Sequence, residues 1–201
     1  MMYLSQVIWR IDDVSPNTDM AKLRAICGLL RKKTPGCAIW LGISIFGRRE
    51  WPQESVYPNP PFKDRPLEWF CAINSAAFLD LRSRAFSVGW EGREPLPTGA
   101  LVIASHGLIH ADHSRLSEDA QAMSILTSCS LLQTRIFIPP FCRYDFHTEG
   151  ICEASGIFLA KRVEHGWKSI ECNSFNPLHD RWYLHPWRWT VGRLKEYLQC
   201  D

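Results

Sequence analysis

The sequence predicts an α/β fold with a parallel sheet, because apolar segments alternate with stretches of helical pattern. Residues 7–11, 37–45 and 101–104 are almost continuously apolar, which is typical of strands buried on both faces. A stretch with helical spacing separates the first two segments, as in a parallel βα unit. At 201 residues, of which 46% are hydrophobic and 22% charged, the chain is expected to form a single domain over residues 1–201.

The first half of the chain contains one clear βα unit and then a long irregular stretch. A turn at residues 15–18 supplies helix-capping side chains, and apolar residues recur at helical spacing from Met20 to Leu30. Residues 47–66 contain five prolines, so they predict a long surface loop that could form one wall of a binding site. Residues 67–87 are expected to be partly helical.

Strands and helices alternate again in the second half. Ser117 can cap a helix whose first turn carries acidic residues, which favours a helix start at this point. The other expected elements are strands at 135–138, 158–160 and 182–185 and helices at 147–154 and 191–198. The βα pattern therefore covers both halves of the sequence.

Three histidines, His106, His110 and His113, follow the apolar run 101–104. Because α/β proteins place their chemistry where strands give way to loops, His106 is expected at the rim of the sheet. His110 comes four positions later, so a helical turn would direct both imidazoles to one side, where they could share a metal ion. A lone histidine at such a position is more often structural, and His113 is expected to be solvated.

Two carboxylates, Asp12 and Asp13, also follow a predicted strand. Side chains alternate along a strand, so one carboxylate can bind an ion while the other acts as a base. Two histidines and one carboxylate leave coordination positions for water and substrate, as hydrolytic zinc requires. Taken alone, the pair Asp12-Asp13 would more often serve in a turn or a helix cap.

Composition and charge exclude several classes of function. The formal net charge is +2 and the basic residues form no long run, so no nucleic acid is expected as a partner. The eight cysteines show no CxxC spacing, and they are expected to be reduced thiols and not ligands of structural zinc. No signal peptide and no apolar stretch of about 18 residues is evident, which predicts a cytoplasmic protein without a transmembrane segment.

Four segments resemble, in the same order, motifs of the polysaccharide deacetylases, which are carbohydrate esterase family 4 and share the chitooligosaccharide deacetylase homology domain. Residues 10–15 carry the Asp-Asp of the first motif, and residues 105–110 carry the HxxxH pair of the second. Residues 137–141 resemble the Pro-Pro-aromatic groove wall, and residues 184–187 resemble the motif with a leucine and a catalytic histidine.

The resemblance implies a distorted (β/α) barrel with fewer than eight strands, similar to a TIM barrel. It also implies metal-dependent removal of an acyl group from a sugar amine or hydroxyl. By position, Asp12 would be the general base and His185 the general acid. The ligands of a divalent metal, with zinc expected, would be Asp13, His106 and His110. The residues that would bind the substrate or its acyl group are Pro140, Phe141, Arg143, Leu184 and Trp187.

The sequence departs from the family pattern in three places. Ile138 stands where the family has an arginine that steadies the base, and Arg10 or Arg143 could replace it. Cys142 follows the third motif, where the family has a small residue. The motif that steadies the catalytic histidine is not evident, and the candidates for this role are Asp180, Trp182 and Trp167.

The expected function is removal of an acetyl or formyl group from an amino sugar or a glycan precursor, which could be nucleotide- or lipid-linked. The nine tryptophans are compatible with a carbohydrate partner, since indole rings stack on sugars. Two alternatives stay open, namely a metal-dependent amidase for a non-sugar amide and a non-catalytic carbohydrate-binding or assembly protein on the same fold. A cysteine nucleophile at Cys142 near His147 is a weaker interpretation.

Overall fold

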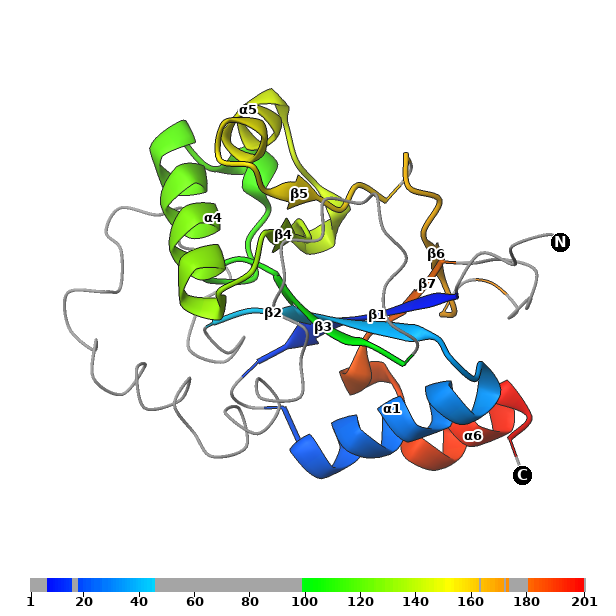
Figure 1. Cartoon of the computed structure of the whole chain (residues 1–201). Helices are drawn as coiled ribbons and strands as arrows, with labels where there is room; N and C mark the ends of the chain where they lie inside the picture. The colour runs from blue at the N-terminus through cyan, green and yellow to red at the C-terminus, as the bar shows by residue number, and fades with distance from the viewer. Residues whose placement is uncertain are drawn as a thin grey trace, which may run out of the picture.

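The structure is a computed structural model, and it describes residues 7–15, 18–45, 99–162, 164–171, 173 and 181–200. Within these ranges, seven strands form one sheet in the order β5-β4-β3-β2-β1-β7-β6. Every neighbouring pair is parallel. The sheet curls around its own interior, and the helices pack on its outside (Figure 1). The predicted distorted (β/α) barrel with fewer than eight strands is confirmed.

The order of elements follows the predicted alternation. The first part of the chain forms β1 (Ile8–Val14), α1 (Met20–Lys33) and β2 (Ala38–Ile43). The middle forms β3 (Leu101–Ser105), η3 (His113–Arg115), α4 (Glu118–Leu132), β4 (Ile136–Phe137), η4 (Pro140–Cys142) and α5 (Phe146–Ala154). The last part forms β5 (Phe158–Leu159), β6 (Lys168–Ser169), β7 (Arg181–Leu184), η5 (Pro186–Arg188) and α6 (Val191–Leu198).

Several predicted boundaries need correction. The first strand continues through both aspartates to Val14, and the helix after it is capped by Asp19, whose carboxylate accepts from the Lys22 N–H at 3.0 Å. The two-residue strand β6 was not predicted, because two residues are too few to show alternation. The loop predicted at 47–66 and the partly helical stretch at 67–87 lie outside the described residues.

Two clusters of buried side chains lie on opposite faces of the sheet. Because side chains alternate along a strand, Trp9, Ile11 and Leu184 share one cluster with residues of α1 and α6. Trp40 and Tyr183 belong to the other cluster, which fills the interior of the curled sheet. Helices α1 and α6 pack against each other below the sheet, and α4 and α5 pack above it (Figure 1).

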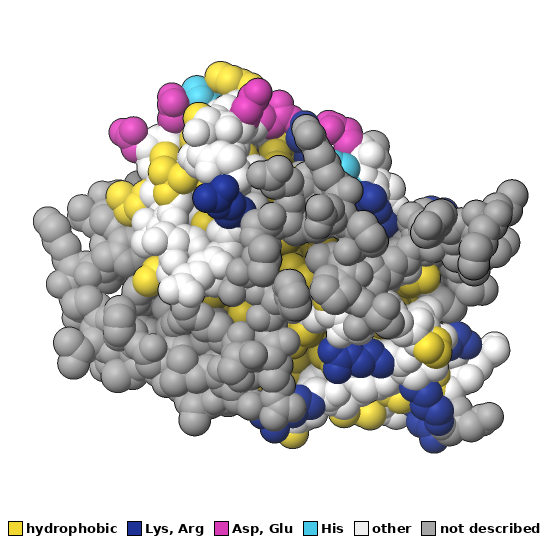
Figure 2. Space-filling view, in the orientation of Figure 1, with side chains coloured by type: hydrophobic (Ala, Val, Ile, Leu, Met, Phe, Trp, Pro, Cys, Tyr) yellow, Lys and Arg dark blue, Asp and Glu magenta, His cyan; other side chains and the backbone are white. Residues whose placement is uncertain are grey.

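The described surface separates charges of opposite sign. Figure 2 shows acidic side chains gathered over α5 and the start of α4, and basic side chains gathered over α1 and α6. None of the described helices combines the length and the apolar character that a bilayer span requires.

Candidate metal centre

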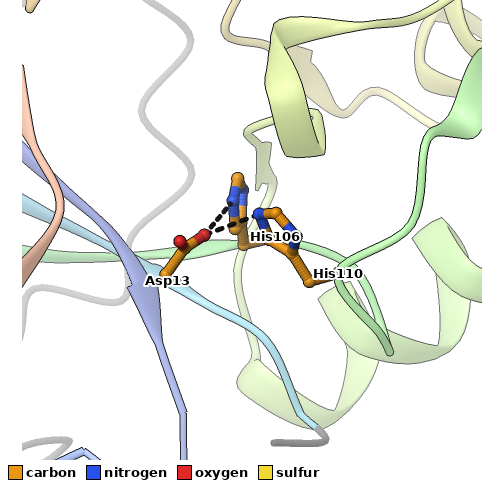
Figure 3. A group of neighbouring side chains, drawn as sticks. All are labelled: Asp13, His106 and His110. Atoms are coloured by element: carbon orange, nitrogen blue, oxygen red, sulfur yellow. Dashed lines mark ion pairs between the residues drawn. The ribbon is translucent and has the colours of Figure 1, made fainter. Parts of the chain in front are cut away.

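Asp13, His106 and His110 converge although they come from two separate parts of the chain (Figure 3). Asp13 Oδ1 lies 3.3 Å from His106 Nε2 and 2.6 Å from His110 Nε2. The three candidate ligand atoms all lie within 4.8 Å of one another. Among the residues that the structure describes, this is the one group of three or more such side chains that could hold a metal ion. Two imidazoles and a carboxylate are suitable ligands for zinc.

A bulge in β1 directs Asp13 toward the histidines. The register between β1 and β2 shifts between Ile11 and Val14, and Asp13 has a left-handed backbone with φ of 59°. Aspartate adopts this conformation more readily than most residues do. Asp12 bonds instead to Arg10, so the two neighbouring carboxylates point in different directions, as predicted.

An irregular turn, and not the helical turn considered from the sequence, brings His106 and His110 together. Gly107 has φ of 86°, and a Cβ atom at this position would lie 2.8 Å from the Ile109 carbonyl oxygen, so a larger residue would not fit. The Gly107 N–H donates to Ser105 Oγ at 3.1 Å. The two imidazole rings still converge, and their centroids are 5.0 Å apart.

The hydrogen bond of His106 determines which of its ring nitrogens is available to a metal ion. His106 Nδ1 lies 2.8 Å from the backbone oxygen of Ile138, which can only accept, so Nδ1 carries a proton. In the neutral ring the lone pair is then on Nε2, which faces Asp13 Oδ1. Two lone pairs repel each other unless a proton or a metal ion lies between them. A carbonyl on the far ring nitrogen is also the usual outer support of a metal-binding histidine.

Asp13 carries its negative charge at neutral pH. Burial alone would raise its pKa, but the adjacent imidazoles of His106 and His110 outweigh burial and hold the pKa of Asp13 well below its usual range. Its second oxygen, Oδ2, accepts a hydrogen bond from Trp187 Nε1 at 2.7 Å. The three candidate ligands therefore present two imidazole nitrogens and one anionic oxygen, a set that suits a divalent cation.

Asp12 lies beside this group and is held by Arg10. Arg10 Nε and Nη2 donate to Asp12 Oδ2 at 3.1 and 2.7 Å, and the two side chains are 0% and 3% exposed. Asp12 Oδ1 is buried and has no hydrogen-bond partner in the described part of the chain. One oxygen of Asp12 is thus anchored, and the other is available to accept a proton.

Of the two arginines considered for holding Asp12, Arg10 lies beside it and Arg143 does not. Arg143 forms an ion pair with Asp112 at 2.9 Å, and its side chain is largely exposed. Arg10 is fully buried, with its guanidinium over the rings of Trp167 and Tyr183. The sequence contained a signal for this role, because residues 10 and 12 of one strand project from the same face.

His185 is held by Glu171, which the sequence analysis missed. His185 Nδ1 lies 2.9 and 3.1 Å from the two carboxylate oxygens of Glu171, and the His185 N–H donates to Glu171 Oε1 at 3.1 Å. Burial alone would lower the pKa of His185. The hydrogen bond that the His185 ring donates to Glu171, together with the negative charges of Asp12 and Asp13, outweighs burial, so the pKa of His185 is raised. His185 is therefore close enough to both aspartates to respond to their charges.

The other candidates for steadying His185 have different surroundings. Trp182 is buried in the cluster between the sheet and helices α1 and α6, and Trp167 packs beside Arg10 in the interior of the curled sheet. Asp180 lies outside the described residues. Glu171 follows the short strand β6 and belongs to no recognisable motif, so nothing in the sequence identified it.

His113 lies outside the metal-binding group, but it is buried and not solvated as predicted. Its side chain is 0% exposed, with Nδ1 at 3.0 Å from the Ala111 oxygen and Nε2 at 3.1 Å from Ser124 Oγ. Burial lowers the pKa of His113 to about 4. At neutral pH it is an uncharged side chain that supports the loop after His110.

Aromatic side chains flank the centre on two sides. Phe141 is 52% exposed, and its ring meets that of His110 edge to face at 4.3 Å. Trp187 is 50% exposed, and its ring centroid is 5.7 Å from that of His185. Pro140, the other residue of the predicted groove wall, is buried behind Phe141 in η4. The exposed rings can contact a bound molecule, whereas Pro140 shapes the backbone.

Leu184 does not line the centre, which corrects its predicted role in the acyl pocket. Its side chain is 0% exposed and belongs to the cluster between the sheet and helices α1 and α6. The residue before it, Tyr183, projects from the opposite face of β7 and lies near Arg10 and His185. Because side chains alternate along a strand, Tyr183, and not Leu184, is the residue of β7 that lies on the side of the centre.

Cys142 contacts Arg10 and does not pair with His147. Its Sγ is 3.5 Å from Arg10 Nη2, and His147 Nδ1 lies 3.3 Å from Glu118. Cys142 has φ of 54°, a left-handed conformation that favours glycine. The thiol thus occupies a position beside the arginine that holds Asp12, and the hypothesis of a Cys142–His147 nucleophile receives no support.

No protein-family model matches the chain, and no curated protein matches it. Solved structures do match its fold. A family 4 carbohydrate esterase from Streptomyces lividans, in complex with acetate, superposes with a TM-score of 0.55 at 10% identity. The match covers 97% of this chain and 86% of that one.

Two further solved structures have a similar fold. A mutant of the peptidoglycan deacetylase PdaC from Bacillus subtilis has a TM-score of 0.54 at 12% identity, with 97% of this chain and 82% of that chain covered. A family 4 pseudoenzyme from Bacillus anthracis has a TM-score of 0.52 at 13% identity, and this chain spans 60% of its length. The chain has the fold of the family 4 carbohydrate esterases.

Proposed function

We propose that the chain is a metal-dependent hydrolase that removes an acetyl or formyl group from the nitrogen of an amino sugar or a glycan precursor. The observation that carries the proposal is the group of Asp13, His106 and His110, with Asp12 next to Asp13 in β1 and His185 linked to Asp13 through the ring of Trp187. An available carboxylate oxygen and an imidazole near possible metal ligands are what amide hydrolysis needs. Simple binding of a sugar requires neither.

Asp12 and His185 would each carry out one of the two proton transfers that the reaction needs. A divalent cation, with zinc expected, would be held by Asp13, His106 and His110 and would supply an activated water and a polarised acyl carbonyl. Asp12 Oδ1 takes the proton of the attacking water, while Arg10 keeps Oδ2 in place.

His185 gives a proton to the leaving amine from Nε2. Glu171 occupies Nδ1, so the imidazole is fixed with Nε2 available for the substrate. The raised pKa of His185 keeps more of the ring protonated at neutral pH than an ordinary histidine would be. Acid–base assistance of this kind typically contributes about 10²–10⁴-fold to the rate.

An acylated amino sugar is the substrate class that fits best. The exposed rings of Phe141 and Trp187 at the edge of the centre can pack on a sugar ring. One protein with the same fold is a peptidoglycan deacetylase, which supports a glycan or its precursor, including a nucleotide- or lipid-linked one. A non-sugar amide is the alternative, and comparison of the two substrate types in one acyl-release assay separates them.

The first test compares two substitutions in the presence of zinc. Asp12→Asn is expected to retain bound metal and to lose acyl release by about 10²–10⁴-fold, because only the proton acceptor is removed. His106→Ala is expected to lose both metal and activity, because it removes a ligand. Metal content after dialysis and release of acetate or formate from acylated amino sugars are measured together. A fully active Asp12→Asn protein would contradict the assignment of the base.

A non-catalytic role is the second candidate, because one protein of the same fold is a pseudoenzyme. This role predicts that the chain binds amino sugars but releases no acyl group, even with zinc supplied. Acyl release that a chelator abolishes and zinc restores would exclude it. The available Asp12 Oδ1 and the His185–Glu171 pair favour catalysis.

A further inference from the structure

Trp187 connects the exposed edge of the site to the candidate metal ligand Asp13. Its indole N–H donates to Asp13 Oδ2 at 2.7 Å, while Asp13 Oδ1 faces His106 and His110. Each oxygen of this carboxylate therefore has a separate role. The bond also joins distant parts of the chain, since Asp13 lies in β1 and Trp187 in η5.

The N–H of Trp187 restricts how Asp13 can bind a cation. A carboxylate can offer a metal one oxygen or both, and rotation about its last torsion changes between these modes. A hydrogen bond to Oδ2 opposes this rotation and leaves Oδ1 as the oxygen that faces the histidines. With two histidine nitrogens, a single oxygen completes three protein ligands and leaves a position for water and substrate.

The short segment η5 is built to hold the ring in this place. Pro186 fixes the backbone at its start, and Arg188 lies over the indole at 4.7 Å. His185, the proposed acid, immediately precedes the segment and is anchored by Glu171. The anchors on both sides of Trp187 limit its movement, although half of its ring is exposed.

We propose that Trp187 is a positioning residue for the metal centre, in addition to any contact its exposed ring makes with a sugar. Its N–H holds Asp13 in the orientation in which only Oδ1 binds the cation. The inference rests on the proposed metal-dependent function. A residue that only contacts the substrate would not affect metal binding, whereas Trp187 is expected to affect metal binding even when no substrate is present.

The test uses Trp187→Phe, which keeps an aromatic ring but removes the N–H. Trp189→Phe is the matched control, because the indole nitrogen of Trp189 has no hydrogen-bond partner among the described residues. Zinc affinity is measured by competition with a chromophoric chelator, without substrate. Loss of an outer-shell partner typically weakens metal binding by roughly 10- to 100-fold, and this loss is expected for Trp187→Phe only.

A second readout follows the coordination directly. In cobalt-substituted protein, visible absorption weakens when a four-coordinate ion gains a fifth ligand, so Trp187→Phe is expected to absorb less strongly than wild type. Thermal unfolding of the metal-free proteins checks that both variants are folded. Equal zinc affinity and equal cobalt spectra in wild type and Trp187→Phe would overturn the inference while leaving the metal site intact. A wild-type protein that binds no zinc would overturn the proposed function itself.

Discussion

At the scale of single residues, Glu171 controls the protonation of His185. The hydrogen bond that the His185 ring donates to Glu171 is the main influence that raises the pKa of His185 against the effect of burial. A general acid must be protonated, so activity is lost as pH rises through this pKa. Glu171→Gln removes the negative charge and lowers the pKa, so the alkaline limb of the pH–rate profile is expected to move to lower pH.

The measurement is kcat/KM for acyl release as a function of pH in wild type and Glu171→Gln. Glu164→Gln is a suitable control, because Glu164 pairs with Lys161 at 3.1 Å and makes no contact with His185 among the described interactions. Superimposable profiles for wild type and Glu171→Gln would show that this carboxylate does not tune the acid. A shift of the alkaline limb to higher pH in Glu171→Gln would contradict the expectation that Glu171 raises the pKa of His185.

His113 makes stability depend on pH. Its pKa is lowered to about 4 in the folded protein, below the ordinary value near 6.5, so the unfolded chain binds a proton first as pH falls. Stability that is present above about pH 6.5 is therefore lost progressively as pH falls toward 4. Between about pH 7.5 and pH 5 the expected loss from this one group is about 2 kcal/mol.

Denaturant unfolding of wild type and His113→Gln at the two pH values measures this loss. Glutamine can retain a hydrogen bond to Ser124, but it does not titrate, so its pH dependence is expected to be smaller by the amount that His113 contributes. Parallel losses of stability in the two proteins would mean that His113 is not held neutral by burial.

At the scale of elements, alternation along β7 decides which side chains can reach the metal centre. Leu184 packs between the sheet and helices α1 and α6. Leu184→Ala is therefore expected to lower the free energy of unfolding by about 2–5 kcal/mol, as buried leucine truncations do. The ratio of acetyl to formyl release is expected to stay unchanged in the folded protein. Leu194→Ala in α6, from the same cluster, is the matched control.

Urea unfolding and acyl preference are measured on both leucine variants. A changed acyl preference in Leu184→Ala, but not in Leu194→Ala, would return Leu184 to the acyl pocket. The sequence motif suggested the pocket because leucine precedes histidine there. It could not show which of Tyr183 and Leu184 faces the centre, because that depends on how β7 packs in the sheet.

Local backbone geometry was the least predictable feature of these elements. The HxxxH spacing correctly placed His106 and His110 together, but through a turn that requires φ of 86° at Gly107 and not through a helix. The bulge at Asp13 likewise depends on pairing with β2, a contact that no local pattern specifies. Spacing therefore predicted which residues meet, whereas tertiary contacts determine how they meet.

At the scale of the whole molecule, the parallel sheet explains why the candidate site was largely predictable. Strands that run in one direction end at the same edge, so residues at or just after the ends of β1, β3 and β7 come together although they are far apart in sequence. This rule applies to Asp13, His106 and His185. It fails for Glu171, which follows a strand too short to recognise.

The most direct measurement is anomalous diffraction at the zinc edge from crystals grown with zinc. We expect one strong peak at roughly 2.0–2.3 Å from Asp13 Oδ1 and from the Nε2 atoms of His106 and His110. A peak ligated by His110 and His113 without Asp13, or zinc bound only elsewhere, would contradict the proposed metal centre.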